Sequence, residues 1–156
     1  MSILVDTGIL LRAFVPGDPQ CALIRESLSR LLREKESLVT TSQNIAEFYN
    51  VSTRPFNSRG GYGLPTSVVE TRVGFLERLC QVLTESQESH KRWKELINRH
   101  GVAGVAVHDA RLVAIMLTHN VTRILTLNDQ DFRRYKSEGI RIETPQSIVG
   151  HGSGDS

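Results

Sequence analysis

Acidic side chains stand beside segments of this sequence that are apolar enough to be buried. Asp6 comes directly after the apolar run 2–5, and Asp129 and Asp131 follow the apolar run 124–127. Two further acids lie beside the apolar faces of predicted helices. The full set is Asp6, Glu47, Asp109, Asp129 and Asp131. Each alone could end a turn or cap a helix, but together, at the borders of core-forming segments, they indicate a shared site.

A group of carboxylates in a folded domain needs a compensating charge. Two unit charges about 5 Å apart repel by roughly 3 kcal/mol at an effective dielectric near 20, whereas a whole domain is stable by only about 5–15 kcal/mol. A divalent cation removes this repulsion. Carboxylates without Cys or His ligands favour Mg²⁺ or Mn²⁺ over zinc, and such an ion can activate a water and stabilise the leaving oxygen of a phosphodiester. The acids therefore predict metal-dependent hydrolysis.

Short apolar strands alternate with helices along the chain. Strands are expected at 2–5, 37–40, 81–83, 123–127 and 140–143, and helices at 8–14, 19–35, 66–80, 88–100, 107–119 and 129–136, with one more that begins after a cap at Thr41 or Ser42. Asp18 is expected to cap the second helix, with Pro19 at its first position. Residues 54–65 hold three Gly and two Pro and predict a loop. The alternation predicts one α/β domain whose parallel sheet is covered on both faces.

Composition narrows the class of protein. The chain has 156 residues, a net charge of +2 and two cysteines, Cys21 and Cys80, which we expect to be buried thiols. Two cysteines alone supply neither a disulfide framework nor a zinc site. No apolar run approaches the roughly 20 residues needed to cross a bilayer, and no signal peptide is visible. We therefore expect a cytoplasmic protein with no membrane association.

Four short motifs occur in the order found in PIN domains. They are Ile3-Leu4-Val5-Asp6-Thr7, Ser42-Gln43-Asn44-Ile45-Ala46-Glu47-Phe48, His108-Asp109-Ala110 and Thr126-Leu127-Asn128-Asp129-Gln130-Asp131-Phe132. The sequence resembles this family, and within it toxins of the VapC type, from about residue 3 to residue 148. The resemblance implies an α/β fold, a three-layer α/β/α Rossmann-like sandwich with a central parallel sheet. Residues 1–149 would form the nuclease domain, and 150–156 a flexible tail.

The resemblance also implies an activity and partners. It predicts an endoribonuclease that depends on Mg²⁺ or Mn²⁺, serves as the toxin of a toxin–antitoxin pair and hydrolyses RNA with a metal-activated water. A cognate antitoxin would inhibit it, and an apolar groove between the early helices would suit an inserted antitoxin segment. Members of the family often form homodimers.

Site residues are carried over position by position. Asp6, Glu47 and Asp109 match the first three catalytic acids of the family. The fourth position is open between Asp129 and Asp131: we expect Asp131 to be catalytic and both to be metal ligands. Hydrogen-bonding support is expected from Thr7, Ser42, Thr126 and Asn128.

Basic residues near these motifs could hold the RNA strand. Arg54 and Arg59 stand with the aromatic Phe56 and Tyr62 in the glycine-containing loop, and Arg133, Arg134 and Lys136 follow the last acidic motif. Basic and aromatic groups together suit a single strand, through phosphate contacts and base stacking. The alternative roles are a packed loop for the first group and a solvated helix face for the second.

Three other interpretations were weighed against the nuclease. Asp6-Thr7-Gly8 also occurs in aspartic proteases, but the long predicted helices argue against that β-rich fold. A phosphatase of the haloacid dehalogenase type needs a second Asp where this chain has Gly8. A catalytically inactive PIN-like domain that binds RNA or protein stays open, and convergence of the acids in space would count against it.

Overall fold

Five parallel strands form the centre of the protein. The computed structural model describes residues 1–150, and the strands in it are β1 (Ser2–Val5), β2 (Ser37–Thr41), β3 (Gln81–Leu83), β4 (Arg123–Leu125) and β5 (Arg141–Glu143). Their order in the sheet is β3-β2-β1-β4-β5, so β1 lies in the middle and pairs with β2 on one side and β4 on the other. The parallel sheet is as predicted.

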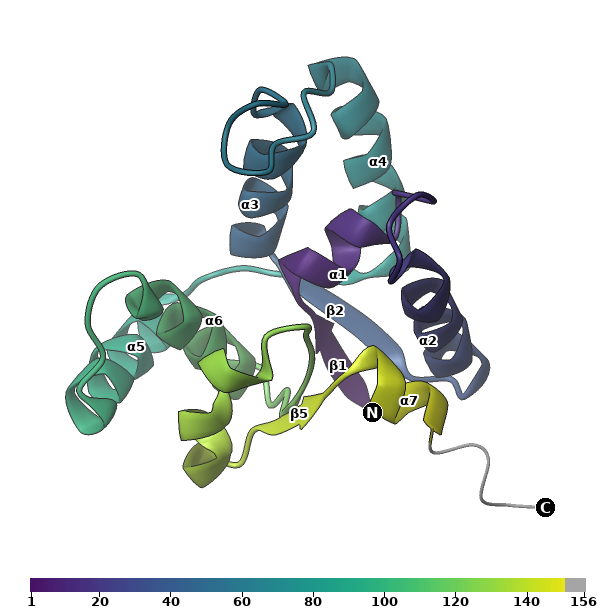
Figure 1. Cartoon of the computed structure of the whole chain (residues 1–156). Helices are drawn as coiled ribbons and strands as arrows, with labels where there is room; N and C mark the ends of the chain where they lie inside the picture. Colours follow the sequence, from purple (N-terminus) through teal and green to yellow (C-terminus); the bar gives the residue numbers. More distant parts are fainter. Residues whose placement is uncertain (151–156) are drawn as a thin grey trace.

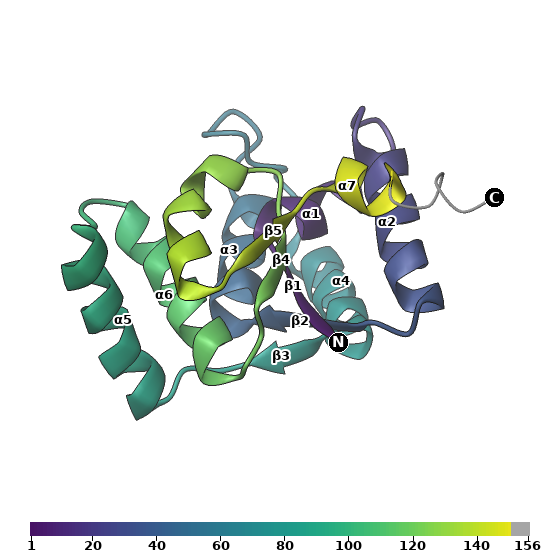
Figure 2. The same cartoon turned by 90° about the horizontal axis from the view of Figure 1, so that it is seen from below.

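Helices cover both faces of this sheet. They are α1 (Thr7–Arg12), α2 (Cys21–Arg33), α3 (Ser42–Thr53), α4 (Thr66–Leu79), α5 (Gln87–His100), α6 (Ala106–Thr118) and α7 (Pro145–Gly150), with two 3₁₀ segments, η1 (Asp129–Asp131) and η2 (Arg133–Glu138). Figure 2 shows α5 and α6 on one side of the strands and α2, α4 and α7 on the other.

Neighbouring residues of β1 face different cores. Ile3 and Val5 pack with side chains from α1, α2 and α4, whereas Leu4 packs with side chains from α5 and α6. A strand buried on both faces must be apolar at every position, which explains the continuous Ile-Leu-Val run. The expected three-layer α/β/α sandwich is confirmed.

Short connections at the carboxyl edge of the sheet set the start of the next helices. Asp6 follows β1 and caps α1, since its side chain accepts a hydrogen bond from the Thr7 backbone N–H at 2.9 Å. Thr41 follows β2 and caps α3 in a capping box with Asn44. This settles the cap that the sequence left open between Thr41 and Ser42.

Two predicted helices differ in the structure. The second helix, α2, begins at Cys21 and not at Pro19. The Asp18 carboxylate accepts a hydrogen bond from the Gln20 N–H, so it closes a turn instead of capping a helix. The helix expected at 129–136 is two 3₁₀ segments that meet at the buried Phe132.

Helix α7 was not predicted. Thr144 and Ser147 exchange hydrogen bonds between side chain and backbone, and Pro145 stands at the first position of the helix. Such a start is readable from sequence. Gly150, expected in the flexible tail, ends this helix, and residues 151–156 of that tail lie outside the described residues.

Two smaller expectations concern the cysteines and the membrane. Cys21 and Cys80 are both buried free thiols, as predicted, and burial raises the pKa of the Cys80 thiol to about 12. Within residues 1–150 no helix is long and apolar enough to cross a bilayer.

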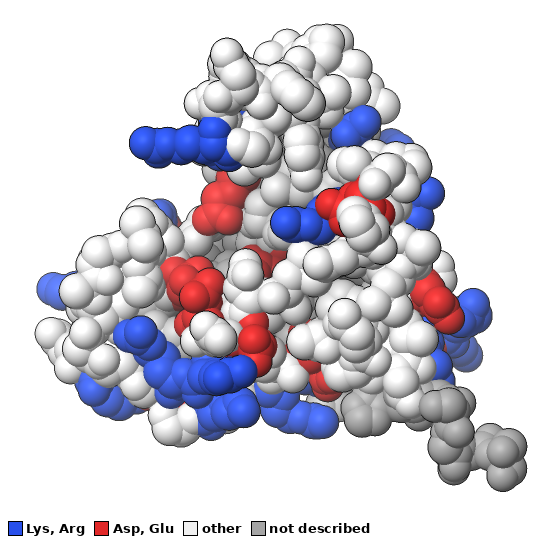
Figure 3. All heavy atoms as spheres, viewed as in Figure 1, with Lys and Arg blue, Asp and Glu red and all other residues white. Residues whose placement is uncertain are grey.

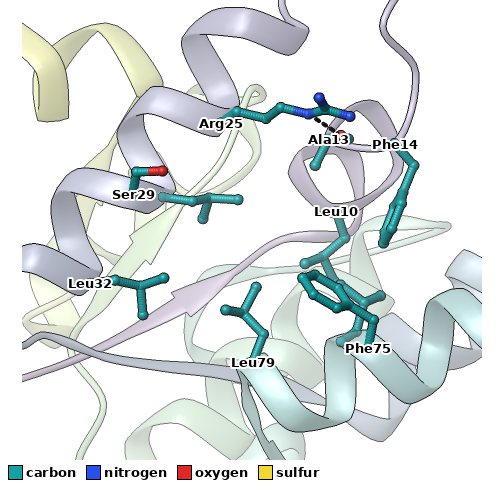
Figure 4. A pocket seen from close by; sticks show the side chains of 10 residues that line it. Leu10, Ala13, Phe14, Arg25, Ser29, Leu32, Phe75 and Leu79 are labelled. Carbon is teal, nitrogen blue, oxygen red and sulfur yellow. Dashed lines mark hydrogen bonds between the residues drawn. The ribbon is translucent and has the colours of Figure 1, made fainter.

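An apolar groove lies between α1, α2 and α4. It has a volume of about 350 Å³, and Figure 4 shows leucine and phenylalanine side chains around it. Leu32 and Phe75 on its walls are 44% and 48% exposed. Arg25 is the one charged residue that lines it, and its Nε donates to the Ala13 carbonyl at 2.8 Å. The groove is thus an apolar surface with one basic side chain, Arg25, among the described residues that line it.

Candidate active site

Four carboxylates come together at the carboxyl edge of the sheet, and we refer to them as the carboxylate cluster. Asp6 follows β1, Glu47 lies in the second turn of α3, Asp109 in the first turn of α6, and Asp131 ends η1. The charges of Glu47 and Asp131 raise the pKa of Asp6, and the charges of Asp6, Glu47 and Asp131 raise the pKa of Asp109. Figure 3 shows acidic side chains in the hollow between the lobe of α3 and α4 and the lobe of α5 and α6.

Asp6 is held by hydrogen bonds from the residue that follows it and from the residue that follows the neighbouring strand β4. Its Oδ1 accepts from the Thr7 N–H at 2.9 Å, and its Oδ2 accepts from the Thr126 hydroxyl at 2.8 Å. Burial nevertheless raises the pKa of Asp6, and the charges of Glu47 and Asp131 add to this effect, while the hydrogen bonds from Thr126 and Thr7 oppose it. The Asp6 carboxylate is therefore fixed in direction but electrostatically unsatisfied.

A buried relay of side chains orients Glu47. The Thr7 hydroxyl donates to Glu47 Oε2 at 2.7 Å and accepts from Asn44 Nδ2 at 2.9 Å. Asn44, fully buried, is in turn fixed by the Thr41 hydroxyl, which donates to its Oδ1 at 2.8 Å. Asn44 Nδ2 also lies 3.4 Å from Asp6 Oδ1. The cap of α3 thus links two members of the cluster.

Gln43 connects the cluster to α6. Its Nε2 donates to Glu47 Oε1 at 3.3 Å and to the His108 carbonyl at 3.0 Å. Because His108 directly precedes Asp109, this side chain ties Glu47 on α3 to the turn that carries the third acid.

Ionisation of Asp109 is disfavoured as well. Burial raises its pKa to about 7, and the charges of Asp131, Asp6 and Glu47 contribute, against a weaker opposing effect of Arg134. A carboxylate with this pKa at a site of like charges is a common mark of a functional position. The arrangement would be relieved by a cation.

Asp129 and Asp131 have different surroundings. Asp129 forms an ion pair with Arg133, 2.7 Å away, whose hydrogen bond lowers the pKa of Asp129. Asp129 is not among the charges that act on Asp6 or Asp109, whereas Asp131 acts on both. Of the two candidates, Asp131 is the one that belongs to the carboxylate cluster.

A comparison with known protein families identifies the family of this chain. The profile described as PIN domain matches residues 3–138. The chain belongs to the PIN domain family. Proteins of this family are generally nucleases. The resemblance found in the sequence motifs is confirmed.

Solved structures of toxin–antitoxin proteins share the fold of this PIN domain. VapBC-1 from nontypeable Haemophilus influenzae is 14% identical with a TM-score of 0.66, over 94% of this chain and 99% of that chain. VapBC2 from Rickettsia felis, bound to a DNA fragment from its promoter, is 14% identical with a TM-score of 0.65, over 92% and 98%. Mycobacterium tuberculosis VapC20, described as a sarcin-ricin loop cleaving toxin, is 17% identical with a TM-score of 0.59, over 89% and 96%. Comparison with curated proteins finds no significant match.

The cluster of this PIN domain is open in its present geometry. Within residues 1–150 no three Asp, Glu, His or Cys side chains stand close enough to enclose a metal ion as they are placed. The charges of the neighbouring carboxylates nevertheless raise the pKa of Asp6 and of Asp109. The donor set, oxygen only and without a compensating Lys or Arg in contact, is the set that Mg²⁺ or Mn²⁺ prefers.

The expected supporting residues divide into two groups. Thr7 and Thr126 bond the carboxylates, as described above. Ser42 is exposed and forms no hydrogen bond with a carboxylate of the described residues, and Asn128 meets the site only through its backbone N–H, which donates to the Thr126 hydroxyl at 3.1 Å.

Sequence reasoning missed Asn44 and Gln43. The spacing Thr41-x-x-Asn44 signals a helix cap, but that its amide also reaches Thr7 depends on the packing of α3 against α1. Gln43 carried no signal, because its contact with His108 joins segments far apart in the sequence.

The four predicted RNA-binding arginines differ in their contacts. Arg54 donates to the Arg59 carbonyl at 3.2 Å, and the Arg59 side chain is exposed. Arg133 is paired with Asp129, whereas Arg134 is exposed and its charge acts on Asp109. Basic side chains border the acidic hollow above and below in Figure 3.

Proposed function

We propose that this chain is a metal-dependent endoribonuclease and the toxin of a toxin–antitoxin pair. The observation that carries the proposal is the carboxylate cluster, in which four acids on separate elements act on one another with no arginine or lysine of the described residues in contact. Membership of the PIN domain family and the fold shared with VapC structures support it.

Asp6, Glu47, Asp109 and Asp131 are the residues that would hold Mg²⁺ or Mn²⁺. Small side-chain rotations or intervening waters would complete such a site, and Mg²⁺ ordinarily keeps several of its waters. When bound, the ion supplies charge stabilisation and activation of a water for phosphodiester hydrolysis. Asp129, predicted as a further ligand, would first have to leave Arg133.

The chain's own residues supply orientation. Thr126 and Thr7 fix the directions of the Asp6 and Glu47 carboxylates, and Asn44 holds Thr7 in the rotamer that donates to Glu47. Groups that orient metal ligands typically change metal affinity or activity about 10–100-fold when they are removed. RNA phosphates would be met by the exposed Arg59 and Arg134.

The groove between α1, α2 and α4 is proposed as the docking site of the antitoxin. Several of the similar structures are toxin–antitoxin complexes, and an apolar groove accepts an amphipathic segment. Arg25 at the groove favours an antitoxin segment with an acidic side chain beside its apolar ones. Leu32→Glu should then release the nuclease from inhibition by its antitoxin, and unchanged inhibition would reject this site.

Two further predictions, on the compartment and on the oligomeric state, belong to this proposal. The protein would act in the cytoplasm, where RNA and a cognate antitoxin are at hand, and it would form a homodimer, which sedimentation velocity can measure.

Cleavage of total RNA tests the proposed function. Purified protein is incubated with Mg²⁺, with Mn²⁺ and with EDTA, beside Asp6→Asn, which keeps the shape of the side chain but removes its charge. Metal-dependent cleavage that the variant lacks is the expected result. A folded wild-type protein that cleaves nothing with either metal would favour the inactive binding module instead.

A further inference from the structure

One aromatic side chain of this chain stands almost entirely in solvent. Phe56, in the loop between α3 and α4, is 83% exposed. Tyr62 on the same loop is partly buried and packs against the core that includes residues of α3 and α4. The loop therefore buries one of its two aromatic rings and presents the other.

The loop that carries Phe56 is held in one conformation by the end of α3. The second half of the loop donates three hydrogen bonds from its backbone N–H groups to carbonyl oxygens of residues 51–54. They run from Tyr62 to Val51, from Gly63 to Arg54 and from Leu64 to Ser52, at 3.1, 2.8 and 2.9 Å. Phe56 is thus presented on a fixed support, and a contact with it costs little ordering of the loop.

The backbone of this loop is also specialised. A Cβ at Gly61 would lie 2.4 Å from the Arg54 carbonyl oxygen, so no other residue fits there without a shift of the backbone. Arg59 has a φ of +45°, which is unfavourable for a residue with a side chain. Strain of this kind persists where the surrounding structure imposes it, and it occurs often at binding sites.

The charges of the loop favour a polyanion as the ligand. Residues 54–65 contain Arg54 and Arg59 and no acidic residue, and the Arg59 side chain is exposed. The loop begins where α3 ends, and α3 carries Glu47 of the carboxylate cluster about 10 Å before Arg54 along the helix axis. Figure 1 shows this loop at the upper end of α3, whose lower end meets the sheet. One bound strand can reach both.

We propose that Phe56 is a stacking platform for an unpaired base of the RNA substrate. The base lies on the Phe56 ring while the neighbouring phosphates meet Arg59 and the cleaved bond lies at the carboxylate cluster. Every base has an aromatic face, so the platform selects single-stranded or looped-out RNA over a duplex without reading its sequence. The inference rests on the proposed nuclease function and adds to it a substrate class and a residue that selects it.

A protein partner is less favoured at this position. The groove assigned to the antitoxin is lined by residues of α1, α2 and α4 and of the segment after α1, and by none of residues 54–65. A loop with two arginines and no acid matches phosphates better than it matches a second copy of itself, which would bring like charges together.

The test measures RNA binding in EDTA, where no cleavage is expected. The probe is an unstructured oligoribonucleotide that contains 2-aminopurine, whose fluorescence falls when the base stacks on an aromatic ring. Wild type is compared with Phe56→Ala, Phe56→Leu and Phe56→Trp. Val105→Ala is the matched control, because Val105 is an equally exposed apolar residue, 86%, on the turn between α5 and α6.

Stacking predicts a specific order of affinities. Phe56→Ala and Phe56→Leu should each weaken binding about tenfold and abolish the fluorescence change, Phe56→Trp should restore both, and Val105→Ala should equal wild type. Duplex RNA of the same sequence should not distinguish the variants. Wild-type affinity in Phe56→Ala would overturn the proposal, and so would full binding by Phe56→Leu, which keeps the apolar contact without the ring.

The remaining outcomes separate this inference from the proposed function. Cleavage by wild type together with unchanged binding by Phe56→Ala rejects the platform and leaves the nuclease. Binding that depends on Phe56 in a protein that cleaves no RNA supports the platform and rejects the nuclease. If Phe56→Ala instead loses antitoxin binding or dimerisation and keeps RNA binding, the ring serves a protein contact and the proposal is wrong.

Discussion

Two clusters of charge in this PIN domain are built on opposite principles. In the Arg123 cluster, which consists of Glu36, Arg123 and Glu143, the arginine lies 3.1 Å from one carboxylate and 3.7 Å from the other. Glu143 receives a further hydrogen bond from the Ser147 hydroxyl at 3.0 Å. In the carboxylate cluster, the charges of the other acids act on Asp6 and Asp109, and among the described residues Arg134 is the basic side chain whose charge opposes them, at Asp109.

Burial alone does not explain the difference between the clusters. The side chains of Arg123 and Glu143 are each 11% exposed, so the paired cluster is also removed from water. The Met1 ammonium also lies 3.3 Å from Glu36, and Arg141 lies 4.0 Å from Glu143, so the acids of the Arg123 cluster are paired inside the protein. The carboxylate cluster is left with excess negative charge, which an external cation can remove. The contrast separates a structural ion network from a site that awaits a ligand.

The largest effect is expected from removing one charge of the carboxylate cluster. Asp109→Asn keeps the size of the side chain, so the fold should persist, while a metal ligand is lost. Metal-dependent RNA cleavage should fall by about a thousandfold, or ~4 kcal/mol of transition-state stabilisation. Initial cleavage rates at saturating Mn²⁺ measure this. Wild-type rates in the variant would remove Asp109 from the proposed site.

The same variant should change how stability depends on pH. The pKa of Asp109 is about 7 in the folded protein against an ordinary value of 3.8, so the folded chain holds this proton more tightly than the unfolded chain. Its contribution to stability is present at low pH and is lost as the pH rises from about 4 to about 7. In EDTA, Asp109→Asn should therefore unfold at a higher temperature than wild type at pH 8 and gain little at pH 4. Equal melting temperatures at both pH values would contradict this.

Breaking the Arg123 cluster should affect stability and not activity. Arg123→Met keeps an apolar stem of similar length but removes the cation that Glu36 and Glu143 share. Among the described residues, Glu36 is then left with the Met1 ammonium at 3.3 Å and Glu143 with Arg141 at 4.0 Å. The free energy of unfolding should fall by about 2–3 kcal/mol, somewhat less than for a fully buried pair, while the cleavage rate per folded molecule stays at the wild-type value. Urea denaturation and RNA cleavage measure the two. A loss of cleavage as large as that of Asp109→Asn would erase the distinction between the clusters.

A smaller effect is expected from a residue that only orients a carboxylate. Thr126→Val is nearly isosteric and removes the hydrogen bond to Asp6 Oδ2. Metal affinity or cleavage should fall about tenfold, and higher Mn²⁺ concentrations should restore part of the rate. Ser42→Ala is the control, since Ser42 has no such contact, and an equal loss in both variants would reject the positioning role.

The smallest effect separates the two acids after β4. Asp129→Asn removes a carboxylate that pairs with Arg133 outside the cluster, so cleavage should change less than about twofold, within the range of ordinary surface substitutions. Asp131→Asn removes a member of the cluster and should impair cleavage far more. The reverse order would make Asp129 the fourth acid.

The main features of the site could be predicted because each has a local signal. Asp6 follows an apolar strand, and Glu47 and Asp109 stand on helices whose apolar faces are readable, so topology alone brings them to one edge of the sheet. The choice between Asp129 and Asp131 could not be made, because both follow the same strand and the difference lies in how η1 turns and where Arg133 reaches. Asn44 was missed for a related reason: its helix cap is local, but its bond to Thr7 depends on tertiary packing.

The errors in the fold were of a similar kind. Asp18 followed by Pro19 is typical of a helix start, but the Asp18 side chain closes a turn and the helix begins at Cys21. Helix α7 did carry a local signal in Thr144, Pro145 and Ser147, which lay close to the chain's end and was not used.

Direct binding of Mn²⁺ tests the central claim, that the carboxylate cluster and not the Arg123 cluster awaits a cation. Isothermal titration at pH 8 compares wild type with Asp109→Asn and with Glu143→Gln, which removes a charge from the paired cluster. We predict saturable binding by wild type, the same affinity in Glu143→Gln, and at least about tenfold weaker binding in Asp109→Asn. No binding by wild type, or equal losses in the two variants, would contradict the account.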